Sequence, residues 1–121
     1  MRRTTTLVTA LLLTLLSLTA CSNDSGGGAG SGGGTGTTVD ITIKNGKVTP
    51  HGDRVKATVG QPITLNIDAD TAGEIHVHSS PEQEIAFEKG TSTKKLTIDQ
   101  PGIVDVEDHA LEQVIVQLEV S

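Results

Sequence analysis

The feature that most restricts the fold is a two-residue alternation of apolar and polar side chains that recurs in short runs. These runs are Val39–Ile43, Val55–Val59, Ile63–Ile67, Lys95–Ile98, Ile103–Val106 and Val114–Val120. Each run is typical of a strand with one buried face. Turn-forming pairs such as Asn45-Gly46 and Pro101-Gly102 fall between them. With one further strand around His76, about seven strands and no amphipathic helix predict an antiparallel Greek-key β-sandwich.

The alternation does not extend into the segment from Ser79 to Gly90. Only Ile85 and Phe87 have the apolar character of buried residues there. We therefore predict a loop followed by a short strand. The acidic group Glu82-Gln83-Glu84 lacks the spacing of a calcium loop, so we interpret it as solvated surface.

The amino-terminal residues indicate export. A short basic start, Met1-Arg2-Arg3, precedes an apolar stretch from Leu7 to Leu18 that is too short to span a membrane as a helix. The sequence LTAC ending at Cys21 resembles a bacterial lipobox, in which the cysteine sulfur receives a diacylglyceryl group before cleavage. We expect residues 1–20 to be a lipoprotein signal peptide and Cys21 to be the lipidated first residue of the mature chain. An ordinary signal peptide with an incidental cysteine is the alternative.

The segment after the signal predicts a tethered domain. Residues 21–38 hold Cys21 and a Gly/Ser/Thr-rich run without apolar periodicity, which indicates a flexible tether with a reach of roughly 20–25 Å. Residues 39–121 suffice for one small core and leave no room for a second. We expect this domain to be lipid-anchored at the cell membrane, facing the extracellular or periplasmic side.

The charge of the chain narrows the class of partner. The formal net charge of −6 becomes −8 once Arg2 and Arg3 leave with the signal. An acidic surface disfavours nucleic acid and gives anionic lipid headgroups no basic patch, so membrane attachment would depend on the acyl chains. The partners we expect are the membrane, a metal ion and an envelope protein.

Three segments carry a resemblance to a known family. VGQPITLNI (residues 59–67), GEIHVHS (73–79) and PGIVDVEDHALEQVIVQLEV (101–120) together resemble the small secreted cupredoxin-like domains found on bacterial lipoproteins, over residues 39–121. The resemblance implies a cupredoxin-like β-sandwich. In electron-transfer cupredoxins the closing hairpin gives copper a cysteine, a histidine and usually a methionine. Here the thiolate position falls at or near Asp108, and Cys21 and Met1 are the only sulfur residues. A blue-copper centre is therefore not expected.

The pattern His-X-His at His76 and His78 is the main candidate for a binding site. Side chains i and i+2 of a strand project from one face, about 6.5–7 Å apart at their bases. Two imidazoles so placed can tilt onto one ion. His109, at the same end of a cupredoxin-like sandwich, is the natural third ligand, and Asp108 or Glu107 would add an oxygen. Imidazole with carboxylate suits copper(II) or zinc, and the pattern does not choose between them.

The competing interpretation is that this pair does no more than face solvent. Ile75 and Val77 share the opposite face of the same strand, so their burial alone would turn His76 and His78 outward. The fourth histidine, His51, lies beside Pro50 and Gly52 in an expected turn, and we interpret it as a surface residue.

Three functions follow from these features. The first is a lipid-anchored, non-enzymatic binding domain of the cell envelope that holds copper(II) or zinc through histidines. The second is a metal-free structural or protein-interaction sandwich on a stalk. The third is a small metal-dependent hydrolase or hydratase with an activated water. The chain shows no Ser/His/Asp arrangement and spares few residues for a substrate pocket, so we expect no enzymatic activity.

Replacing Cys21 tests the predicted anchor. Cys21→Ala removes the sulfur that would carry the lipid, and the acidic domain offers no second means of attachment. We expect the mature variant in the soluble fraction after cell fractionation at high salt. The unprocessed precursor must be scored separately, because its Leu-rich signal would hold it in the membrane. Mature variant that stays in the membrane fraction would contradict the prediction.

Overall fold

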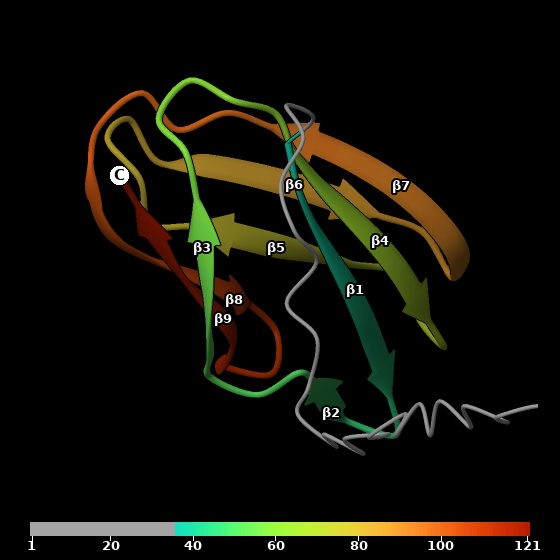
Figure 1. The fold of residues 1–121 in the computed structure, drawn as a ribbon. Coiled ribbons are helices and arrows are strands. Elements are labelled where there is room, and N and C mark those ends of the chain that lie inside the picture. The colour runs from blue at the N-terminus through green and yellow to red at the C-terminus, as the bar shows by residue number, and fades with distance from the viewer. Residues whose placement is uncertain (1–35) are drawn as a thin grey trace, which may run out of the picture. The chain divides into compact units, whose positions relative to one another are not determined.

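The computed structural model describes residues 36–121, whose regular elements are nine β-strands in two facing sheets (Figure 1). The four-stranded sheet has the order β2 (Lys47–Thr49), β1 (Thr37–Lys44), β4 (Ile63–Ala69) and β7 (Gly90–Leu96). The five-stranded sheet has the order β3 (Asp53–Ala57), β9 (Gln113–Val120), β8 (Gly102–Asp108), β5 (Gly73–Val77) and β6 (Gln83–Phe87). The predicted signal peptide, Cys21 and most of the expected tether lie outside the described residues.

The predicted all-β sandwich is confirmed. Five of the seven strand pairs are antiparallel, whereas β1 pairs with β4 and β3 with β9 in parallel. Parallel neighbours arise where the chain crosses to the other sheet before it returns, which side-chain alternation within one strand does not reveal. The strand that the sequence pattern missed is β2, which has three residues and one buried side chain, too few for an alternation to register.

The core lies between the two sheets and is built from the apolar positions of the alternating strands. In β4 the burial pattern alternates over all seven residues, with Ile63, Leu65, Ile67 and Ala69 inside. The two sheets thus meet through branched aliphatic side chains, which pack well on a pleated surface. The single phenylalanine, Phe87 of β6, is also buried in this cluster.

The domain begins slightly earlier than the sequence predicts. Thr37 and Thr38, expected in the tether, belong to β1 and pair with Ile63 and Thr64 of β4. The main-chain N–H of Thr37 also donates to the oxygen of Pro62 at 3.1 Å. No helix with the length and apolar character needed to cross a bilayer occurs in residues 36–121.

Gly73 at the start of β5 makes room for Phe87. The two residues are register partners on β5 and β6, and a Cβ on Gly73 would lie 2.6 Å from Cζ of Phe87. Real Cβ atoms do not approach a ring carbon so closely, so a side chain there would displace the phenylalanine from its packed position. The residue that opens the His-X-His strand is therefore set by core packing.

Gly73→Ala should destabilise the domain by about 1–3 kcal/mol, the usual cost of overpacking a well-filled core. Urea unfolding of the purified protein measures the change. Gly46→Ala serves as a comparison, because a Cβ there meets no atom within 4 Å although its φ of 69° adds backbone strain. Any loss of stability in Gly46→Ala would therefore come from backbone strain and not from a steric clash. A Gly73→Ala variant as stable as the parent would contradict the packing argument.

Candidate metal centre

The His-X-His strand presents its histidines on the outer face of the five-stranded sheet. Ile75 and Val77 of β5 are completely buried, and the residues between and beside them point the other way. The side chain of His76 remains 16% exposed and that of His78, just past the end of β5, 46% exposed. The strand-face geometry expected from the alternation is therefore present.

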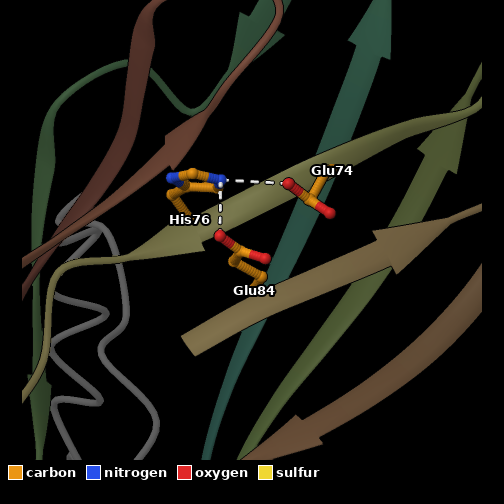
Figure 2. A group of neighbouring side chains, drawn as sticks. All are labelled: Glu74, His76 and Glu84. Carbon is orange, nitrogen blue, oxygen red and sulfur yellow. Dashed lines mark hydrogen bonds and ion pairs between the residues drawn. The ribbon is translucent and has the colours of Figure 1, made fainter. Parts of the chain in front are cut away.

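His76 lies at the centre of a group of carboxylates. Its Nε2 is 3.0 Å from Oε1 of Glu74, two residues earlier on β5, and 3.7 Å from Oε1 of Glu84 on β6 (Figure 2). Its Nδ1 is 3.6 Å from Oε1 of Glu82. Glu84 is the register partner of His76, so the pairing of β5 with β6 brings these two side chains together. The ligand atoms of Glu74, His76 and Glu84 lie within 4.8 Å of one another.

His78 has a similar environment on the other side of Glu82. Its Nδ1 is 3.4 Å from Oε1 of Glu82, and its Nε2 forms a 3.1 Å hydrogen bond with Oε2 of Glu107 on β8. Because an ionised carboxylate can only accept, the ring nitrogen must donate in that bond. Glu82 therefore stands between the two histidines, each of which has a further carboxylate at its other nitrogen.

The group carries a concentration of negative charge. Four glutamates face the two imidazoles, and each has its shortest ionic contact with a histidine. Among the described residues, the only Lys/Arg–carboxylate pair within 4.0 Å is Lys44 with Asp68, on the other sheet. Within residues 36–121, no lysine or arginine therefore neutralises these glutamates at close range, and a cation would be attracted to them.

His109 joins the group by ring stacking. It follows β8, and its main-chain N–H donates to the oxygen of Glu74 at 3.1 Å. Its ring stacks on that of His76 with centroids 4.2 Å apart and planes inclined by 15°. The lone pair of an imidazole nitrogen lies in the ring plane, so two nearly parallel stacked rings do not aim at one point. The structure brings His76, His78 and His109 together, but His76 and His109 are not oriented toward a shared ion.

Asp108, expected to add an oxygen to the histidines, points to the opposite side of the sheet. It is the register partner of Ile75 and is 2% exposed. Its Oδ1 accepts the main-chain N–H of Leu111 at 2.9 Å, which caps the turn between β8 and β9. The expectation of an Asp108 ligand is therefore corrected, and the outward-facing neighbour Glu107 is the carboxylate of β8 that reaches a histidine.

The remaining candidate residues lie apart from this group. His51 is exposed between β2 and β3 and lines a shallow depression with Lys47, Val48 and Gln113. Cys21, the predicted lipidation site, lies outside the described residues.

Sequence reasoning missed three members of the group, Glu74, Glu82 and Glu84. Glu82 and Glu84 were interpreted as solvated surface, and they are about half and two-thirds exposed, yet both contact the histidines. The sequence feature that could have predicted these contacts is the hairpin formed by β5 and β6. Glu-X-His-X-His and Glu-X-Glu are separated by a short Ser/Pro segment, and an antiparallel return would place their alternate side chains on one face.

Comparisons with solved structures show the fold. A Cu(I) form of a methionine-to-alanine variant of amicyanin matches with a TM-score of 0.52 and 13% identity, over 69% of this chain and 82% of that one. A purple cupredoxin from Nitrosopumilus maritimus matches with a TM-score of 0.51 and 16% identity, over 70% and 99%. The described domain has the cupredoxin fold. No protein-family model matches the chain, and no curated protein matches it.

A blue-copper ligand set does not fit the closing hairpin of this cupredoxin-like domain. The buried position expected for a thiolate holds Asp108, whose Oδ1 is occupied by the turn. Phe87 and Leu111 line the adjoining cavity, which has a volume of about 60 Å³. The only cysteine is Cys21, and the only methionine is Met1. The nitrogen and oxygen donors that could hold an ion gather instead on the outer face of the sheet.

Asp108→Ala tests the structural role of the buried carboxylate. Loss of the acceptor leaves the N–H of Leu111 without its partner, which should cost about 1–3 kcal/mol of unfolding free energy. Asp108→Asn keeps a carbonyl oxygen in place and should cost less. Thermal unfolding of both variants measures the effect, and equal losses would show that the negative charge matters more than the cap.

Proposed function

We propose that this chain is a lipid-anchored cupredoxin-like domain of the cell envelope that binds copper(II) or zinc and has no catalytic activity. Binding takes place at the group of histidines and glutamates on the outer face of the five-stranded sheet. The fold and the side-chain cluster support the proposal. The export and lipidation signals in the first 21 residues support the location.

The arrangement around His76 is the observation that carries this proposal. An imidazole only 16% exposed has three carboxylate oxygens between 3.0 and 3.7 Å from its two nitrogens. Neutral imidazole offers one lone pair and every carboxylate offers more, so carboxylate oxygens lie beside the lone pair of His76 whichever nitrogen carries it. A divalent cation is the ligand that such a set complements.

The donor types narrow the choice of metal. Imidazole nitrogen with carboxylate oxygen suits zinc and copper(II), and at a given nitrogen–oxygen site copper(II) binds more tightly than zinc. The absence of a thiolate among the described donors removes the charge-transfer chemistry of a blue-copper centre. We therefore propose ion binding, as a carrier or a sensor, in place of electron transfer.

One observation favours a metal-free alternative. His76 and His78 each already donate an Nε2 hydrogen bond to a glutamate, at 3.0 and 3.1 Å, so the group has internal partners without an ion. In that case the outer sheet face would be an acidic interaction surface on a stalk, directed at an envelope protein. The same titration separates the two functions.

Metal should raise the melting temperature of the protein, because an ion bound only by the folded state stabilises it by mass action. At a free concentration of 100 times Kd the gain is about 2.7 kcal/mol, which corresponds to roughly 10–20 °C for a domain of this size. Thermal unfolding with zinc or copper(II) at pH 7.5 measures it. The full chain should carry Cys21→Ser so that no thiol competes for the metal.

His76→Ala should remove most of this gain, and His51→Ala should leave it intact. His51 is the matched control, since it is a histidine outside the group. Lowering the pH should weaken binding, because protons compete with metal for imidazole nitrogen. If neither metal moves the melting temperature, or if both alanine variants lose the gain equally, the metal-binding proposal fails.

A further inference from the structure

We infer that the ion is held by Nδ1 of His76, Nδ1 of His78 and a carboxylate oxygen of Glu82. This inference rests on the proposed function and assigns the atoms of its site. It makes Glu82 a ligand and leaves Glu74 and Glu107 as partners of the opposite ring nitrogens. The alternative ligand set is Nε2 of His76 with Glu74 and Glu84. The two sets have only the side chain of His76 in common, and they use different nitrogens of it.

The first step concerns the nitrogens that are already occupied. Nε2 of His76 lies 3.0 Å from Glu74, and Nε2 of His78 lies 3.1 Å from Glu107. A carboxylate accepts, so each Nε2 carries a proton, and in the neutral imidazole that a metal requires the lone pair is then on Nδ1. Histidines that bind a metal almost always donate their other ring N–H to a carboxylate, a main-chain oxygen or water. Both histidines show this pattern.

The second step concerns the nitrogens that remain. The two Nδ1 atoms approach one oxygen, Oε1 of Glu82, at 3.6 Å for His76 and 3.4 Å for His78. The longer of these distances is beyond a hydrogen bond. With both Nδ1 atoms unprotonated, two lone pairs face an anionic oxygen, which is unfavourable unless a metal ion or a proton lies between them. A bound cation would convert the repulsion into three favourable contacts.

The two nitrogen–oxygen separations are close to those of a metal site, whereas the two histidine rings lie too far apart. Ligand atoms bound tetrahedrally at 2.0–2.1 Å lie roughly 3.3–3.4 Å from one another, and the two nitrogen–oxygen separations are 3.4 and 3.6 Å. The ring centroids of His76 and His78 are 6.3 Å apart, whereas tetrahedral coordination through ring nitrogens holds them roughly 5 Å apart. Binding therefore requires an approach of about 1 Å. His78 can supply it, because it is 46% exposed and lies just beyond β5.

His109 has a positioning role in this arrangement. Its ring stacks on His76 at 4.2 Å and holds that ring with Nε2 toward Glu74 and Nδ1 toward Glu82. His76 is then the fixed member of the site and His78 the member that closes. Because the stacked rings do not aim at one point, His109 contributes no nitrogen to the ion.

Glu82→Gln and Glu84→Gln form a matched pair that tests the ligand set. Both remove one negative charge from an exposed glutamate near His76, but only Glu82 is a ligand in the inferred site. The probe is zinc, titrated into the full chain carrying Cys21→Ser in detergent. We expect Glu82→Gln to weaken zinc affinity at least about 10-fold more than Glu84→Gln. Loss of a residue that only hydrogen-bonds to a ligand already costs about 10-fold or more, and loss of a ligand itself should cost no less. Imidazole nitrogen NMR of the zinc form should show Nδ1 coordination at His76 and His78.

Each outcome of this pair has a definite meaning. A larger loss for Glu84→Gln, with Nε2 of His76 bound, would overturn the inferred atoms and leave the proposed function standing. Equal losses would overturn them too, because the glutamates would then act only through charge. Failure of the parent chain to bind zinc and copper(II) would defeat the proposed function and this inference together.

A second variant separates stacking from coordination at His109. His109→Phe keeps an aromatic ring against His76 and removes both nitrogens, so zinc affinity should stay within about threefold of the parent, well short of the 10-fold or greater loss expected for a partner of the site. His109→Ala removes the stack and should weaken zinc binding more than His109→Phe. If the phenylalanine variant loses as much affinity as the alanine variant, His109 is a ligand and the inferred set is wrong.

Discussion

Ile75 and Val77 are completely buried between the two sheets, and this hydrophobic constraint decides what the outer face of the domain presents. Side chains alternate along a strand, so burying these two residues turns Glu74 and His76 outward. A slip of one residue would drive an imidazole and a carboxylate into an aliphatic core, at a cost far above that of any surface contact. Strand pairing then adds carboxylates from the two neighbouring strands, because the register of β5 places Glu84 of β6 and Glu107 of β8 on either side of His76.

The electrostatics of the outer face follow from that placement. Four glutamates share the space around His76 and His78, and within residues 36–121 none of them pairs with lysine or arginine at ion-pair distance. The imidazole N–H groups satisfy two of the carboxylates and leave Glu82 facing ring nitrogens. Repulsion among like charges on a half-exposed surface is moderate in water. The proposed ion would relieve the repulsion that remains at Glu82.

Side-chain alternation predicted the two-layer fold and the shared face of His76 and His78, because burial of apolar residues is a local property of each strand. The alternation also indicates that Asp108 is buried, because it lies on the same face of β8 as Val104 and Val106. We expected it at the surface because a carboxylate is charged. The contacts of Glu82 and Glu84 depend on how β6 returns beside β5, and the stacking of His109 depends on the hydrogen bond between His109 and Glu74. Such relations between distant residues are set by register and side-chain rotation, which no single segment specifies.

The position of the donors also bears on the kind of chemistry that the domain could carry out. In this cupredoxin-like fold the interior end of the closing hairpin is taken up by Asp108 and its turn, so a buried centre with a sulfur ligand has no place there. An ion on the outer face would lie beside glutamates that are more than half exposed, open to water and to other ligands. Buried centres exchange ligands slowly because the protein must open, whereas an exposed set can release its ion by rotating a side chain. For the proposed ion, this geometry favours reversible exchange over the retention that electron transfer requires.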